Sequence, residues 1–231
     1  MKKKIIVFLI IAVIMILFAT KTNYFIIKKI NYNNANYKTN ISFDNIIEKK
    51  LNLLFISNSF LTKEILKKSV IKDVIIKKQF PDQLDLTIDY KKPFLKIKEN
   101  KIPIIINQNG EVLLINSNID LDYEIYGLNI AYYKKGKELK IYNQELLDRL
   151  INLIFLIKKS NVDINYKIIY NNDSIELETK EGIKVEFGNC KDIEKRFNNF
   201  INIYINLLDK GIKKGTIDVS ITELPLFKGK N

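Results

Sequence analysis

The feature that most constrains this chain is an unbroken apolar run near its amino terminus, from Ile5 to Ala19. Three lysines precede the run, and Lys21 follows it, so charge bounds it on both sides. As a helix the run covers about 22 Å at a rise of ~1.5 Å per residue. Snorkelling of the flanking lysines brings this length close to a hydrocarbon core of roughly 30 Å. We therefore expect residues 5–21 to form a transmembrane signal anchor.

The flanking charges also predict the orientation of this anchor. Lys2, Lys3 and Lys4 favour a cytoplasmic tail at residues 1–4, which places residues 22–231 outside the cell membrane as a single-pass type II protein. A cleaved signal peptide is the alternative, but Leu17-Phe18-Ala19 matches a small-x-small cleavage site poorly. The uncleaved anchor is therefore favoured.

The charge of the chain comes almost entirely from lysine. The net charge is +12, and Arg149 and Arg196 are the only arginines. Lysine lacks the planar fork that reads guanine edges and phosphates, so a nucleic-acid partner is not expected. Acidic residues are interspersed with the lysines, which favours a solvated basic surface over a binder of anionic wall polymers.

Residues that carry chemistry are scarce. The chain has no histidine, its one cysteine is Cys190, and it has no glycine-rich phosphate loop or nucleophile elbow. The carboxylates Asp82, Asp85 and Asp89 lie in a single strand, where a solvent-facing role fits better than acid–base catalysis. We expect no enzyme activity, no catalytic, cofactor-binding or metal site, and no small-molecule substrate.

Periodicity in the region after the anchor predicts the order strand, helix, helix, strand, strand. A proline cannot donate to a strand ladder, so Pro81 belongs in a connection between the last two strands. The elements are a strand over 25–32, a helix begun by Ser42, a helix begun by Thr62, and strands over 74–80 and 84–90.

Beyond Pro93 the pattern predicts a larger unit of strands with two amphipathic helices. Leucine and isoleucine recur at helical spacing over 144–159, and Phe197, Phe200 and Tyr204 mark a second helix over 192–210. Strands are expected at 94–100, at 102–116 with a turn at Asn109-Gly110, and at 166–170, 174–179, 183–187 and 215–221. The fold class is α+β.

The strand–helix–helix–strand–strand order is that of the POTRA module, and the chain resembles the FtsQ/DivIB family of bacterial cell-division proteins. The residues that carry the resemblance are Ile30–Asn34, Asn52–Phe55, Val74–Ile88, Lys91-Lys92-Pro93, and Tyr123–Asn129 as a connector before the central helix. The resemblance implies a POTRA domain at 24–92, a mixed β-domain with two packed helices at 93–224, and a short tail at 225–231. It also implies that Lys78, Phe80 and Pro81 belong to the hairpin that closes the POTRA sheet.

The strand near the carboxyl terminus is the candidate site. It follows a helix, so it is a candidate for a sheet edge whose free N–H and C=O groups another chain can complete. An ordinary strand covered by a neighbour is the alternative from the residues alone. The resemblance implies that a partner strand adds here, and the predicted contact residues are Thr216, Ile217, Asp218, Val219, Ser220, Ile221 and Thr222.

The implied partners are small bitopic coiled-coil division proteins of the FtsB/DivIC and FtsL type and the septal peptidoglycan synthase complex. The expected function is a non-catalytic, membrane-anchored scaffold of the divisome, enriched at the septum, that links early and late division proteins. A POTRA-containing chaperone or transport component of the envelope is the alternative. Such proteins usually carry tandem POTRA repeats or a β-barrel, and here a single module is followed by a different domain.

Overall fold

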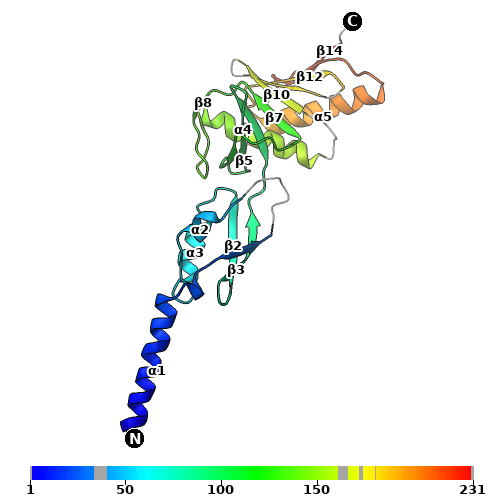
Figure 1. Cartoon of the computed structure of the whole chain (residues 1–231). Helices are drawn as coiled ribbons and strands as arrows, with labels where there is room; N and C mark the ends of the chain where they lie inside the picture. The colour runs from blue at the N-terminus through cyan, green and yellow to red at the C-terminus, as the bar shows by residue number, and fades with distance from the viewer. Residues whose placement is uncertain (1, 34–40, 161–165, 172–173, 180, 230–231) are drawn as a thin grey trace. The chain divides into compact units, whose positions relative to one another are not determined.

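The computed structural model describes residues 2–33, 41–160, 166–171, 174–179 and 181–229 (Figure 1). The chain divides between Lys91 and Lys92 into an amino-terminal unit and a carboxy-terminal unit. Both mix helices and strands, which confirms the predicted α+β class.

Helix α1 (Lys2–Lys21) contains the apolar run. It is long and apolar enough to cross a membrane, and none of its apolar window is buried in the protein. A helix that is apolar all round needs an apolar environment. Because the protein does not supply that environment, α1 is not a core helix of the amino-terminal unit.

The rest of the amino-terminal unit confirms the predicted order of elements. The short 3-10 helix η1 (Asn23–Phe25) leads into β1 (Lys29–Tyr32), and two helices precede the remaining strands. Those elements are α2 (Asp44–Glu48), α3 (Asn58–Ile65), β2 (Ile71–Gln79) and β3 (Gln83–Tyr90). The sheet order is β1-β3-β2, with β1 parallel and β2 antiparallel to the central β3.

Both helix starts differ from the prediction. Helix α3 begins earlier than expected, because the N–H of Phe60 donates to Ser57 Oγ at 3.2 Å, and Thr62 lies inside the helix. At α2 the N-cap residue is Phe43, while Ser42 Oγ accepts from the N–H of Asp44 at 3.0 Å. Ser57 has the extended backbone that a capping residue needs, and an apolar pattern does not reveal that.

A nine-stranded sheet forms the centre of the carboxy-terminal unit, in the order β14-β13-β12-β11-β10-β7-β4-β5-β6. Its strands are β4 (Leu95–Glu99), β5 (Ile102–Ile106), β6 (Val112–Ile115), β7 (Tyr123–Tyr126), β10 (Tyr166–Asn171), β11 (Ser174–Glu178), β12 (Ile183–Gly188), β13 (Gly215–Asp218) and β14 (Leu226–Gly229). A separate ribbon pairs β8 (Ile130–Tyr132) with β9 (Lys140–Ile141).

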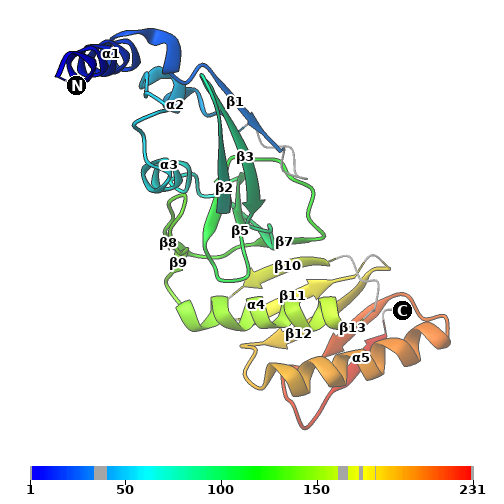
Figure 2. The same ribbon diagram turned by 90° about the horizontal axis from the view of Figure 1, so that it is seen from below.

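Helices α4 (Gln144–Lys159) and α5 (Ile193–Asp209) match the predicted ranges and cover one face of the sheet. Figure 2 shows both helices along the same side of the strands. Alternate strand residues such as Leu177, Val185 and Ile217 are buried in one cluster with residues of both helices. The intervening residues face away from the helices and are mostly polar, as strand alternation predicts.

The segment Tyr123–Asn129 differs from its expected role as a connector. Its first four residues form β7, which lies between β4 and β10 and is parallel to both. The three-residue spacing of Tyr123 and Tyr126 does not suggest a strand. The two strands that β7 joins are far apart in sequence, so its role depends on long-range pairing.

On the face away from the helices, Glu124 of β7 is the centre of an ion-pair network with β4. Its carboxylate lies 2.5 Å from Lys96 Nζ and 2.8 Å from Lys98 Nζ, and Tyr126 Oη donates to it at 2.6 Å. Burial raises the pKa of Glu124, but the hydrogen bonds from these three residues outweigh burial and lower the pKa to about 2. Glu124 therefore stays charged at neutral pH and provides the counter-charge for Lys96 and Lys98.

Replacing Glu124 with glutamine is expected to lower the free energy of unfolding by about 3 kcal/mol at neutral pH, because two lysines lose their counter-charge. The pKa in the folded state is about 2, below the ordinary 4.5. The stabilisation is therefore fully present above pH 4.5 and is lost as the pH falls toward 2. Urea unfolding of both proteins across this range measures the difference.

Glu138→Gln is the matched control, because Glu138 pairs with Lys140 at 2.6 Å and both side chains are half-exposed. Glu138→Gln should lower the free energy of unfolding by less than about 1 kcal/mol. An equal decrease in the free energy of unfolding in the two variants would show that the Glu124 network stabilises the protein no more than an exposed ion pair does.

Candidate functional site

The strand predicted as an open edge lies inside the sheet. Strand β13 runs parallel to β12 on one side, and on the other side it is antiparallel to β14. The prediction that this strand is an open edge is therefore wrong, because Thr216, Ile217 and Asp218 are paired on both sides. The chain reverses after Asp218, and residues 226–229, expected as part of a tail, form β14 and cover β13.

The structure separates the seven predicted contact residues into distinct environments. Ile217 and Val219 are fully buried in the core, and the N–H of Val219 donates to the carbonyl of Glu186 at 2.9 Å. Thr216 and Asp218 lie on the sheet face away from the helices, because they alternate with buried Gly215 and Ile217. A proline at position 219 would remove this N–H and so break a hydrogen bond within the sheet.

The remaining three residues belong to the turn that leads to β14. Ser220 donates through its N–H and its hydroxyl to Asp218 Oδ1, at 3.0 and 2.6 Å. Burial raises the pKa of Asp218, but the bonds from Ser220 and the nearby charge of Lys228 together outweigh burial, so the pKa is lowered overall. Asn199 Nδ2 of α5 donates to the carbonyl of Thr222 at 2.8 Å, and Ile221 is exposed.

Strand β14 fits against β13 because a glycine faces it. A Cβ atom added to Gly215 would lie 2.5 Å from the ring of Phe227, closer than side-chain atoms approach. Without a side chain at Gly215, the Phe227 ring can pack against the helix-covered core. Leu226 and Lys228 alternate with Phe227 and point to the opposite face.

The two ends of the sheet differ in how they are covered. At β6, the segment 134–139 covers the start of the edge, because the N–H of Val112 donates to the Lys137 carbonyl and the N–H of Gly136 donates to the Val112 carbonyl, both at 2.8 Å. Among the described residues, no strand lies beyond β14. Within the part of the chain that the structure describes, β14 is therefore an open edge of this sheet.

Exposed apolar side chains surround this open edge. Ile221 and Leu224 in the turn and Leu226 in β14 are all exposed, and the N–H of Leu224 donates to the Ile221 carbonyl at 3.2 Å. We call β14 together with Ile221 and Leu224 the carboxy-terminal edge. A free strand edge beside exposed apolar side chains has the properties of a surface that receives another strand.

The three hairpin residues singled out from the sequence lie where β2 turns into β3. Lys78 Nζ donates to the carbonyl of Ile56 at 2.5 Å, and Phe80 and Pro81 form the turn, with Phe80 exposed. The turn is thus tied to the loop that precedes α3. Asn34, the last residue of the segment Ile30–Asn34 that carries the family resemblance, lies outside the described residues.

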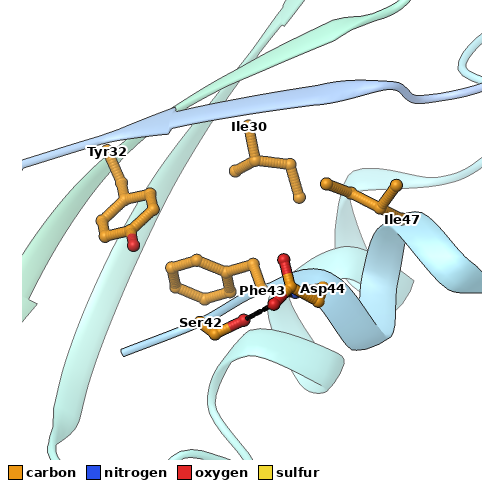
Figure 3. Close-up of a pocket in the computed structure, with 6 residues that line it drawn as sticks. All are labelled: Ile30, Tyr32, Ser42, Phe43, Asp44 and Ile47. Atoms are coloured by element: carbon orange, nitrogen blue, oxygen red, sulfur yellow. Dashed lines mark hydrogen bonds between the residues drawn. The ribbon is translucent and has the colours of Figure 1, made fainter. Parts of the chain in front are cut away.

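A pocket in the amino-terminal unit and the single cysteine are the other features with a bearing on chemistry. A pocket of about 250 Å³ lies between β1 and α2, and Figure 3 shows its six lining residues. Its polar groups bind within the protein, because Tyr32 Oη donates to the Ile41 carbonyl and Ser42 Oγ donates to Asp44. Cys190 is buried, and burial raises the pKa of its thiol to about 12, so it is not a nucleophile at neutral pH.

Comparison with protein families matches residues 98–220 to the family described as "Cell division protein FtsQ/DivIB, C-terminal". The matched region is more than half of the chain and contains most of the nine-stranded sheet and both helices. This chain belongs to the FtsQ/DivIB family. The resemblance inferred from the sequence is confirmed, and β14 lies outside the matched residues.

Relatives of this FtsQ/DivIB protein match nearly its whole length. It is 27% identical over 232 residues to "Cell division protein DivIB" of Clostridium botulinum (strain Loch Maree / Type A3), covering 98% of this chain and 90% of that protein. It is 26% identical to the protein of the same name in Clostridium tetani, covering 87% of this chain and 77% of that protein. These similarities support a family role in cell division.

Proposed function

We propose that this FtsQ/DivIB protein is a non-catalytic, membrane-anchored scaffold of the division machinery. It positions septal peptidoglycan synthesis by binding small bitopic division proteins of the FtsB/DivIC and FtsL type. The relatives are named cell division proteins, which favours division over envelope transport. The chain has no histidine and its one thiol is buried, which agrees with a role in assembly.

In this proposal α1 is the uncleaved anchor. Lys2, Lys3 and Lys4 stay in the cytoplasm by the positive-inside bias, and the two folded units lie outside the membrane, enriched at the septum. The amino-terminal unit, with its β-α-α-β-β order, is a POTRA module. The carboxy-terminal unit carries the partner-binding edge.

The single observation that carries the proposal is the unequal covering of the two sheet edges. A segment of the chain covers the start of β6 at Val112, whereas the outer side of β14 meets no strand in the described residues. A partner strand can add there and extend the sheet through main-chain hydrogen bonds. Leu226 on one face, with Ile221 and Leu224 in the adjoining turn, offers apolar contacts that select the partner.

A photo-crosslinking side chain in place of Lys228 tests this site in living cells, because Lys228 is exposed and lies within β14. The expected product is an adduct with a small bitopic division protein, identified by mass spectrometry. Tyr142, which is the most exposed large hydrophobic side chain of the carboxy-terminal unit among the described residues, is the matched control position. Adducts of equal yield from both positions, or none from Lys228, would exclude this edge as the binding site.

A further inference from the structure

Four exposed apolar side chains lie near the point where α1 ends, and the proposed function leaves them unexplained. They are Tyr24, Leu54, Phe55 and Phe80, with exposed fractions of 52%, 39%, 63% and 57%. We call these four the membrane-end cluster. Large apolar side chains exposed together mark an interaction surface.

Hydrogen bonds hold the three segments that carry the cluster together. The N–H of Leu53 donates to the Phe25 carbonyl at 2.7 Å, which joins the loop 52–55 to the residues after α1. The N–H of Lys28 donates to the Asp82 carbonyl at 2.9 Å, which joins the β2–β3 turn to the segment between α1 and β1. Lys78 Nζ, near the end of β2, donates to the carbonyl of Ile56 at 2.5 Å, which joins the β2–β3 hairpin to the residue that follows the loop.

The side chain of Asn52 ties the loop to α1 itself. Its Nδ2 donates to the carbonyl of Ala19 in the last turn of α1 at 2.7 Å, and its Oδ1 accepts from the N–H of Leu54 at 3.0 Å. One side chain therefore shapes the loop that exposes Leu54 and Phe55 and fixes this loop beside the end of the helix. Aromatic contacts continue across the junction, since the Phe18 ring lies 5.8 Å from Tyr24 and 6.3 Å from Phe25.

From this arrangement we infer that the membrane-end cluster docks into the outer interfacial layer of the bilayer that α1 crosses. The inference rests on the proposed anchoring role of α1. If α1 spans the hydrocarbon core, Ala19 lies near its outer boundary, and a loop bonded to Ala19 lies at the level of the lipid headgroups. Aromatic side chains are enriched at that depth because their apolar rings and polar edges suit it.

Positive charge near the same segments also favours docking to a lipid surface. Lys21 and Lys50 are exposed and lie close in sequence to the segments of the cluster, whereas Lys28 is paired with Asp82 at 3.1 Å. Each lysine near an anionic bilayer surface adds on the order of 1 kcal/mol of attraction. The apolar cluster and the lysines therefore favour a lipid surface that contains anionic headgroups. Docking there would set the orientation of the amino-terminal unit relative to the bilayer.

Fluorescence quenching in vesicles tests the depth of the cluster. The full chain is placed in vesicles of equal parts phosphatidylcholine and phosphatidylglycerol, with a fluorophore on a single introduced cysteine, Phe55→Cys or Phe80→Cys. Cys190 is buried and stays unlabelled. Lipids with a nitroxide on the headgroup should quench both labels several-fold more than a label at Ile75→Cys.

The control position Ile75 is itself exposed and apolar, and it lies in β2 about 16 Å along the strand from Phe80. Equal quenching at positions 55, 75 and 80 would overturn the inference. Quenching that appears only when the small division proteins are added would assign the cluster to a protein partner and would overturn it as well.

A label at Ile11→Cys, in the middle of α1, separates failure of the inference from failure of the anchor. If nitroxides on the acyl chains quench position 11 while headgroup nitroxides leave positions 55 and 80 unquenched, the anchor stands and the docking is wrong. If position 11 is not quenched either, the anchoring role itself is wrong.

Discussion

Replacing Gly127 with alanine is expected to lower the free energy of unfolding of the carboxy-terminal unit by about 3 kcal/mol or more. Gly127 follows β7 with φ +82°, and an added Cβ would lie 2.3 Å from the carbonyl oxygen of Tyr170 on β10. The left-handed backbone alone costs about 1–2 kcal/mol for a residue with a side chain. The clash adds more, because β10 is a central strand that cannot move without breaking its pairing with β7 and β11.

Gly211→Ala is the matched control for this prediction. Gly211 has a similar φ of +70°, but no atom lies within 4 Å of the position of an added Cβ. This substitution should therefore lower the free energy of unfolding by only about 1 kcal/mol, the cost of a left-handed backbone for a residue with a side chain. Denaturant unfolding followed by circular dichroism measures both variants, and an equal loss in the two would show that the approach of Tyr170 to Gly127 is not a constraint.

Removing residues 224–231 is the second change with a large expected effect. It deletes β14 and Leu224, and with them the surface to which the partner strand is proposed to add. Four residues of strand pairing and the adjoining apolar contacts contribute about 3 kcal/mol, so we expect affinity for the partner proteins to fall by roughly 100-fold. The buried residues of β13 and α5 remain, so the unit should stay folded at reduced stability.

The sign of this effect distinguishes two ways of strand addition. If the partner extends the sheet beyond β14, removing β14 weakens binding. If β14 instead occupies the position of the partner strand on β13, removing it frees the edge at Gly215–Asp218 and strengthens binding. Lys228→Glu retains the backbone of β14 and changes an exposed side chain, so it should alter binding far less than the deletion.

The elements that sequence analysis predicted well are those whose pattern is local. Helix α4 was expected at 144–159 and is observed over Gln144–Lys159, because its apolar stripe is regular and Asn143 caps its start. Strands β11 and β12 alternate strictly between buried and polar residues, so their positions could also be predicted. Local periodicity is sufficient in such segments.

The candidate site could not be placed in the same way, because an edge is a property of pairing between distant segments. Residues 215–218 show good alternation, which predicts a strand but not what covers it. The covering strand β14 has four residues, Leu-Phe-Lys-Gly, too few for a periodic signal. The glycine at position 215, which admits the ring of Phe227, was the one indication of a close neighbour.

A binding titration of the purified small bitopic division proteins against the full chain and the chain lacking residues 224–231, both in the same lipid nanodiscs, tests the scaffold most directly. We predict that a strand of the partner protein pairs with the outer edge of β14. The shortened chain should therefore bind the partner about two orders of magnitude more weakly while remaining folded. Unchanged or tighter binding by the shortened chain would contradict this.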